Sequence, residues 1–195
     1  MLAQHKVRVN GLHCHMSRAR GLDAWRLRAQ TMLGLVEKYD LRDLDYISLG
    51  SGMYGRMDPE LMAQFPAAPN YREYGEAVIS CFAEYYKDKA HKPALFTEPG
   101  TTLVSKYVDF VAKVIGIKTV RDRQFVLMNC SFHNLGETCQ MKNLPIRIFH
   151  NGEQSENVAH ANSVGCTCLE QDVIYHDYRG EIAVGDYVEL GNVGG

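Results

Sequence analysis

The chain has 195 residues, which is enough for one ordinary domain or two small ones. Its residues are 46% hydrophobic and 23% charged, and this composition argues against a disordered chain, a collagen or a coiled coil. Its 21 Lys and Arg residues are balanced by 23 Asp and Glu residues, so it lacks the basic excess typical of nucleic-acid binding. It has neither an apolar run long enough for a membrane span nor a secretory signal in its first ten residues, which predicts a cytoplasmic protein without a membrane or nucleic-acid partner.

The first half of the chain alternates strand-like and helix-like segments. Strands are expected at 7–13, 45–49 and 93–97, and helices at 22–39 and 71–89. The first helix is indicated by apolar residues at spacings of four and three: Trp25, Ala29, Met32, Val36 and Tyr39. This order predicts parallel β/α units, as in an α/β barrel, where the carboxyl ends of the strands carry the ligand site.

From about residue 107 the sequence changes to β-branched segments that are punctuated by glycines. Further strands are expected at 124–128, 145–149, 171–175 and 186–190. These segments indicate an antiparallel β-domain. The expected fold class is therefore α/β followed by all-β, with domains at 1–106 and 107–195.

Polar residues gather where each of the three strands of the first half is expected to end, at 13–17, 50–55 and 98–101. In an α/β barrel these three clusters would converge on one mouth. The coincidence is the first functional signal in the sequence, because ligand sites of such folds lie at the carboxyl ends of the strands.

Two of these clusters suggest specific chemistry. Gly50, Ser51 and Gly52 could surround a phosphate, because glycines let several backbone N–H groups approach an anion, although such loops are more often tight turns. Glu98, which precedes Pro99 and Gly100, is either a fixed functional carboxylate or an acid that caps a turn.

The first cluster contains two histidines that flank Cys14. On a strand His13 and His15 would face the same side. A metal site would need a third ligand, which the spacing does not identify, so no metal is assigned. The simpler interpretation is one packed histidine and one that faces a ligand.

The six cysteines are irregularly spaced, which argues against a disulfide scaffold and against a zinc ribbon. Cys168 lies in the polar segment 165–172 and is a candidate nucleophile if a histidine pairs with it. The spacing selects no such partner, and buried, inert cysteines are the more frequent case.

Taken in order, these clusters resemble the fold-type III pyridoxal-phosphate (PLP)-dependent decarboxylases, which include the ornithine, diaminopimelate and arginine decarboxylases, and the wording is nearest to the diaminopimelate branch. The resemblance covers nearly the whole chain. It rests on the motifs Gly11–His15, Leu49–Gly52, Glu98–Gly100, Gly165–Cys168 with Asp172, Val184–Tyr187 and Asn192–Gly194.

The resemblance implies the second half of a PLP-binding α/β barrel, similar to that of alanine racemase, followed by the C-terminal β-domain. It implies that His15 stacks on the cofactor ring, that Glu98 pairs with the pyridine nitrogen, and that Cys168 reaches the active site of a neighbouring subunit to help protonate the carbanion. The implied protein is a homodimer with shared active sites. The residues implied to bind the cofactor are His15, Gly50, Ser51, Gly52, Glu98 and Gly100.

The sequence also departs from the family pattern. It has no counterpart of the lysine that carries the cofactor as a Schiff base, so the chain is expected to be a fragment that is inactive alone. Thr101 stands where many relatives have an arginine. Leu169 replaces an acid that holds the substrate's distal amine, and Glu170 would face the other side of a strand.

The expected function is PLP-dependent decarboxylation of an amino acid, diaminopimelate or a related basic amino acid, by the full-length protein. The alternative is a non-catalytic, decarboxylase-like protein that lacks the lysine and binds a partner or free PLP. A third possibility is an incomplete gene product without a stable function, because half a barrel leaves sheet edges and apolar helix faces open.

Overall fold

A computed structural model describes residues 2–65, 68–136, 138–151 and 154–194. Contacts divide the chain into two compact units, each described by itself below. The first unit comprises Met1–Gly55 and Ala67–Thr102, and the second comprises Arg56–Pro66 and Leu103–Gly195. The segment 56–66, which the sequence analysis assigned to the first domain, therefore shares its contacts with the second unit.

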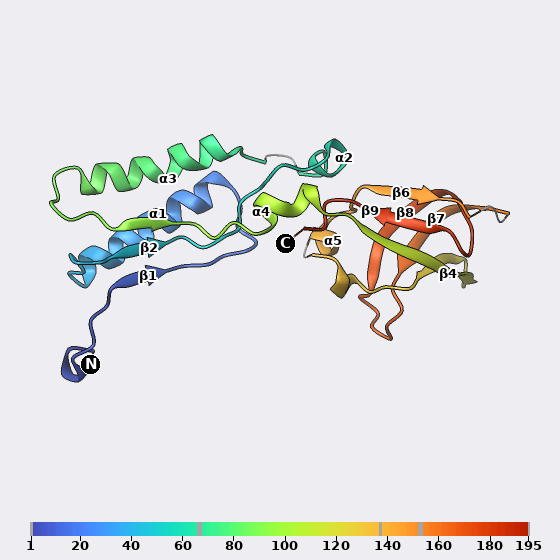
Figure 1. The fold of residues 1–195 in the computed structure, drawn as a ribbon, viewed down its shortest axis with the longest axis horizontal. Coiled ribbons are helices and arrows are strands. Elements are labelled where there is room, and N and C mark those ends of the chain that lie inside the picture. The colour runs from blue at the N-terminus through green and yellow to red at the C-terminus, as the bar shows by residue number, and fades with distance from the viewer. Residues whose placement is uncertain (1, 66–67, 137, 152–153, 195) are drawn as a thin grey trace. The chain divides into compact units, whose positions relative to one another are not determined.

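The first unit is built on a three-stranded parallel sheet in the order β1-β2-β3. Its strands are short: β1 (Gly11–His13), β2 (Tyr46–Ser48) and β3 (Ala94–Phe96), with Gly11 beside Tyr46 and Tyr46 beside Ala94. The connecting helices are α1 (Leu22–Lys38) and α3 (Tyr71–Tyr86), which run along the sheet in Figure 1. A short 3-10 helix, η1 (Leu2–His5), precedes β1. The prediction of parallel β/α units is confirmed.

Helix α1 buries the apolar stripe that the sequence predicts. Trp25 and Ala29 are fully buried, whereas Tyr39 follows the last helical residue and is mostly exposed. Helix α3 begins at a capping box in which the Asn70 side chain and the Glu73 side chain each accept the other residue's backbone N–H. With 17 residues α1 is the longest described helix, and none of the described helices is long and apolar enough to cross a membrane.

The parallel sheet has one covered face and one open face. Ile47 in the central strand is fully buried in the core that includes α1 and α3. Its neighbours in the sequence point the other way, because successive side chains of a strand alternate. Tyr46 and Phe96 are exposed on this opposite face and form an edge-to-face ring pair with centroids 5.9 Å apart.

The second unit is a six-stranded, curved sheet that closes nearly into a barrel, in the order β6-β9-β4-β5-β7-β8. Its strands are β4 (Phe110–Val120), β5 (Arg123–Met128), β6 (Ile146–Phe149), β7 (Glu156–Val164), β8 (Val173–Ile182) and β9 (Tyr187–Leu190). Its short helices are α2 (Pro59–Met62), η2 (Ser105–Tyr107), η3 (Phe132–Asn134) and α5 (Thr138–Met141). Helix α4 (Thr101–Val104) spans the division between the units.

The expected fold class is confirmed, but the second sheet is mixed and not wholly antiparallel. Strands β5 and β7 pair parallel, with Val126 opposite Ser163. Strand β7 was not among the predicted strands, because its sequence is polar and lacks alternation. Val158 and Ala161 are both buried although three positions apart, because the pairing of β7 with β8 is irregular between them and His160 adopts a φ of 60°.

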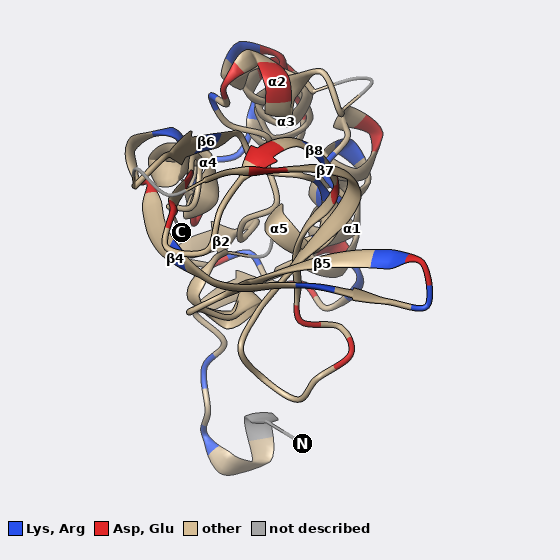
Figure 2. Ribbon diagram, turned by 90° about the vertical axis from the view of Figure 1, so that its right-hand side faces the viewer, with Lys and Arg blue, Asp and Glu red and all other residues tan. Residues whose placement is uncertain are grey.

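The hairpin between β4 and β5 turns at Arg121 and Asp122, which both have positive φ angles. Two consecutive residues of this conformation form the tight turn that matches the twist of two antiparallel strands. Figure 2 shows basic and acidic residues side by side at this hairpin tip. The turn is thus set by backbone geometry without a glycine.

Asp186 is a fully buried carboxylate that holds the connection between β8 and β9. It accepts hydrogen bonds from the backbone N–H groups of Ala183 (2.8 Å) and Asn151 (3.0 Å), and its Oδ2 lies 2.9 Å from His150 Nδ1. Burial by itself raises the pKa of Asp186, but these hydrogen bonds outweigh it, and the net pKa is lowered.

Because the folded-state pKa of Asp186 lies below the unfolded value, the carboxylate stabilises the fold at neutral pH, and this contribution disappears as the pH falls through the acidic range. Asp186→Asn should therefore lower the free energy of unfolding by about 2 kcal/mol at pH 7 and by less near pH 3. Urea titrations at both pH values measure the difference. Asp122→Asn, at the exposed hairpin tip, is the control, and an equal effect of the two variants would contradict the assignment.

Candidate functional site

The site is built where the three parallel strands of the first unit end. Backbone hydrogen bonds continue the pairing past the strands: Cys14 N–H donates to Ser48 O (3.0 Å), and Leu49 N–H donates to Phe96 O (2.9 Å). Further on, the Glu98 N–H donates to Gly50 O (2.7 Å). The segments that follow β1, β2 and β3 are therefore tied side by side at the carboxyl edge of the sheet.

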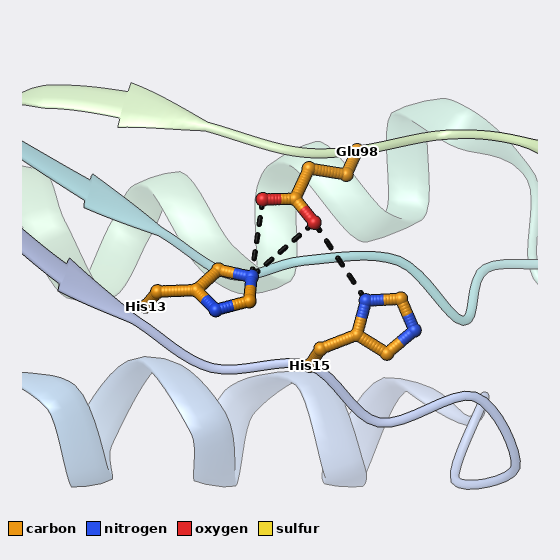
Figure 3. Close-up of side chains that lie close together, drawn as sticks. All are labelled: His13, His15 and Glu98. Carbon is orange, nitrogen blue, oxygen red and sulfur yellow. Dashed lines mark hydrogen bonds and ion pairs between the residues drawn. The ribbon is translucent and has the colours of Figure 1, made fainter.

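Three side chains meet at this edge, and we call His13, His15 and Glu98 the His–Glu cluster (Figure 3). The His13 Nε2 atom lies 3.1 Å from Glu98 Oε1 and 3.2 Å from Oε2, and His15 Nδ1 lies 3.7 Å from Oε2. All three side chains are about half exposed. The two histidines thus face one carboxylate, which the sequence analysis did not pair with them.

Ser48, the last residue of β2, supports the carboxylate from the sheet. Its hydroxyl donates to Glu98 Oε1 (2.8 Å) and accepts a hydrogen bond from the Gly50 N–H (3.2 Å). The hydrogen bond from Ser48 is the largest cause that lowers the pKa of Glu98, and the hydrogen bond from His13 is the next largest. Glu98 is consequently an anion at neutral pH, and Ser48 is a supporting residue that the sequence analysis missed.

The glycine loop, which we define as residues 50–52, lies against the segment that follows β1. Gly50 and Gly52 have φ angles of 65° and 89°, and a Cβ on either would lie 2.4 Å from Cys14 O or 2.1 Å from Met16 O respectively. Both positions therefore require glycine. By contrast, a Cβ at Gly100 would meet no heavy atom within 4 Å, so no contact there requires a glycine.

Arg28 of helix α1 is buried beneath the glycine loop and was not identified from the sequence. Its guanidinium donates to Ser51 O (2.6 Å), Ala19 O (2.6 Å) and Met16 O (2.8 Å), and lies 4.5 Å from the ring centroid of Trp25. Burial lowers the pKa of Arg28. The only sequence signal was its position within the buried stripe, three residues after Trp25.

Arg28 turns the Ser51 carbonyl toward helix α1, whereas the Gly50 carbonyl accepts from the Glu98 N–H at the sheet edge. The Trp25 indole N–H adds a hydrogen bond to Gly52 O (2.9 Å). Within the described part of the chain, no group accepts a hydrogen bond from the backbone N–H of Ser51 or Gly52. A loop whose carbonyls are bound within the protein and which keeps two consecutive N–H groups as donors is suited to binding an anion.

Gly52→Ala should lower the free energy of unfolding by about 2 kcal/mol, because alanine is strained at this φ and its Cβ would overlap Met16 O. Urea denaturation of the full chain measures the loss. Gly34→Ala is the matched control, because Gly34 lies inside α1 with open space around it, so alanine should stabilise the helix there by up to about 1 kcal/mol. Loss of stability in both variants would contradict the explanation.

Cys168 lies in the second unit, in the turn between β7 and β8, with an exposed thiol. The buried Asp172 carboxylate accepts hydrogen bonds from the Thr167 hydroxyl (2.6 Å) and the Phe132 N–H (2.8 Å), and a Cβ on Gly165 would overlap this carboxylate. No histidine of the described residues hydrogen-bonds Cys168. Leu169 and Glu170 lie in the turn and not on a strand, so strand alternation does not separate them as expected.

An open groove of about 520 Å³ lies beside this turn in the second unit. It is lined by Cys166 and Cys168 together with apolar side chains of β4 and β5 such as Ile115 and Leu127. Cys130 is buried, and burial raises the pKa of its thiol to about 12 and keeps it protonated.

The comparison with protein families identifies the second unit. Residues 101–194 match the family described as "Pyridoxal-dependent decarboxylase, C-terminal sheet domain". Over these residues the chain is similar to the sheet domain of pyridoxal-dependent decarboxylases. The predicted family resemblance is therefore confirmed. No curated protein sequence matches the chain significantly.

Solved structures of decarboxylases share the fold of both parts. A diaminopimelate decarboxylase is 21% identical, with a TM-score of 0.75, over 99% of this chain and 47% of its own. The arginine decarboxylase of Paramecium bursaria Chlorella virus is 17% identical with a TM-score of 0.71, and the match covers 99% of this chain and 51% of that enzyme. The lysine decarboxylase of Selenomonas ruminantium is 20% identical with a TM-score of 0.66, and the match covers 98% of this chain and 50% of that enzyme. The chain thus spans about half the length of these structures.

Proposed function

We propose that the chain takes part in PLP-dependent decarboxylation of an amino acid, and that its first unit supplies one side of the cofactor site. The observation that carries this proposal is the meeting of an anionic carboxylate, two histidines and a glycine loop at one sheet edge. The second unit adds a decarboxylase sheet domain.

The residues at this edge fit the chemical groups of PLP. The hydrogen bond from Ser48 keeps Glu98 an anion. A residue that pairs with a protonated pyridine nitrogen must carry this negative charge. His15 is half exposed beside it and would offer an imidazole face to the ring. His13 orients the carboxylate from the other side. When bound, PLP accepts the electrons that remain on the substrate after loss of CO2.

The glycine loop fits the phosphate group of the cofactor. Ser51 and Gly52 would present backbone N–H groups, while Arg28 and Trp25 hold the carbonyls of these two residues away from the anion, and Gly50 would supply the turn. Gly100 lies two residues after Glu98 and would complete the same side of the site. The phosphate would therefore be bound by backbone dipoles at the end of β2.

The substrate class and the assembly are also proposals. The solved structures of similar fold are named as decarboxylases of diaminopimelate, arginine and lysine, which carry an amino or guanidino group at the far end of the side chain. We infer diaminopimelate or a related basic amino acid as substrate. Cys168, with its exposed thiol, would act as a proton donor in the site of a second subunit of a homodimer.

The test is titration of the full chain with PLP and with pyridoxal, which lacks the phosphate, followed by fluorescence. Wild type should bind PLP, and Ser51→Asp should weaken PLP at least tenfold without weakening pyridoxal, because the added charge repels only the phosphate. Ser80→Asp, with the same charge change on the exposed side of α3, is the control. Equal PLP affinity in wild type and Ser51→Asp would overturn the assignment of the loop.

Catalysis is tested separately by CO2 release from diaminopimelate, lysine, arginine and ornithine. Borohydride reduction and mass measurement then show whether one lysine carries the cofactor. Within the described residues, no lysine hydrogen-bonds or ion-pairs with the His–Glu cluster. Release of CO2 supports decarboxylation. PLP binding without an adduct or CO2 release would instead favour the non-catalytic alternative for this chain.

A further inference from the structure

The His–Glu cluster has the composition of a transition-metal site. It offers two imidazole nitrogens and one carboxylate oxygen. Zinc, iron and cobalt ions accept this mixed nitrogen and oxygen set, and two histidines with one carboxylate form a recurring three-ligand arrangement. The sequence alone did not identify a third ligand, and the structure supplies Glu98.

The distances suit a single ion. The ligand atoms of the three side chains all lie within 4.8 Å of one another. Around a tetrahedral zinc ion with bonds of about 2.0–2.1 Å, ligand atoms are about 3.3 Å apart. The side chains are 42–51% exposed, and we expect rotations about their own bonds to bring the nitrogens to this spacing.

The carboxylate is already oriented for such an ion. The Ser48 hydroxyl donates to Glu98 Oε1, and His13 Nε2 lies 3.1 Å from the same oxygen. The other oxygen, Oε2, lies near both histidines, 3.2 Å from His13 Nε2 and 3.7 Å from His15 Nδ1. A hydrogen bond that fixes a metal-binding carboxylate from behind is typical of metal sites. The hydrogen bonds that tie the three strand ends together hold the three backbones in place.

We propose that His13, His15 and Glu98 bind one divalent transition-metal ion, of the zinc and cobalt class, in the chain without cofactor. Three protein ligands leave a coordination position open to water or to a carboxylate of a small molecule. A second consequence rests on the proposed function: the metal and PLP would exclude one another, because both use Glu98 and His15. Metal availability would then regulate cofactor loading.

Metal binding is tested on the full chain without PLP. Isothermal titration with Zn²⁺ and visible absorption of added Co²⁺ should show one site. The background is the Cys166→Ser/Cys168→Ser variant, because these two exposed thiols are the competing ligands. In that background His13→Gln, His15→Gln and Glu98→Gln should each weaken Zn²⁺ at least tenfold, and Ser48→Ala by about tenfold through loss of orientation.

The matched control is His160→Asn. It removes an exposed histidine that also contacts a carboxylate, Asp177, and no second histidine of the described residues joins this pair. Asparagine tolerates the positive φ at this position. The control should leave Zn²⁺ affinity unchanged. No Zn²⁺ binding in the cysteine-free background, or equal loss in His160→Asn and His13→Gln, would overturn the metal site.

Competition between metal and cofactor is a separate measurement. Added PLP should lower the apparent Zn²⁺ affinity, and Zn²⁺ should lower the apparent PLP affinity by the same factor, as linkage requires. Simultaneous, independent binding of both would overturn the mutual exclusion while leaving the metal site standing. A chain that binds Zn²⁺ through the His–Glu cluster but never binds PLP would contradict the proposed function and not the metal site.

Discussion

Replacing Glu98 with glutamine should reduce decarboxylation by a full-length protein carrying this chain by about 100-fold or more, with little change in PLP affinity. Glutamine keeps the size of the side chain and can still meet Ser48, but it has no negative charge to keep a pyridine nitrogen protonated. The rate of CO2 release at saturating substrate and the dissociation constant of PLP measure the two effects independently.

The control for Glu98→Gln is Glu76→Gln, which makes the same chemical change on the exposed surface of α3 and should leave both quantities unchanged. An undiminished rate in Glu98→Gln would show that the carboxylate is not the partner of the ring nitrogen. It would leave open the turn-capping role that the sequence also allowed for this residue.

The Arg28→Lys variant is expected to lose about 3 kcal/mol of unfolding free energy, although the positive charge is kept. Lysine cannot reach the carbonyls of Ser51, Met16 and Ala19 together, as the planar guanidinium does. Urea denaturation measures the loss. Arg26→Ala is the control, because Arg26 lies on the exposed side of the same helix and should change stability by less than about 0.5 kcal/mol.

A positioning role for Arg28 makes a prediction that a purely structural role does not. Under conditions where Arg28→Lys remains folded, PLP affinity should fall at least tenfold and pyridoxal affinity should not, because only the phosphate depends on the orientation of the glycine loop. Equal weakening of both compounds would show that Arg28 supports the unit as a whole and does not orient the loop.

Local patterns accounted for the elements of the first unit and for the position of its site. The spacing of Trp25, Ala29 and Met32 predicted α1, and polar residues after three strands predicted one shared edge. These features are readable because helix periodicity and strand ends are properties of neighbouring residues. Strand β7 was missed because its pattern is not local: its two buried residues, Val158 and Ala161, share a face only through an irregular backbone between them.

The sequence by itself predicted the family resemblance, the order of strands and helices in the first unit, and the candidate residues His15, Gly50, Ser51, Gly52, Glu98 and Cys168. Only the tertiary structure decided that Glu98 meets His13, which is 85 positions away, and that Arg28 is a buried donor to the glycine loop and not a solvated helix residue. Parallel strand pairing makes such contacts, because it aligns the ends of segments that are distant in the chain.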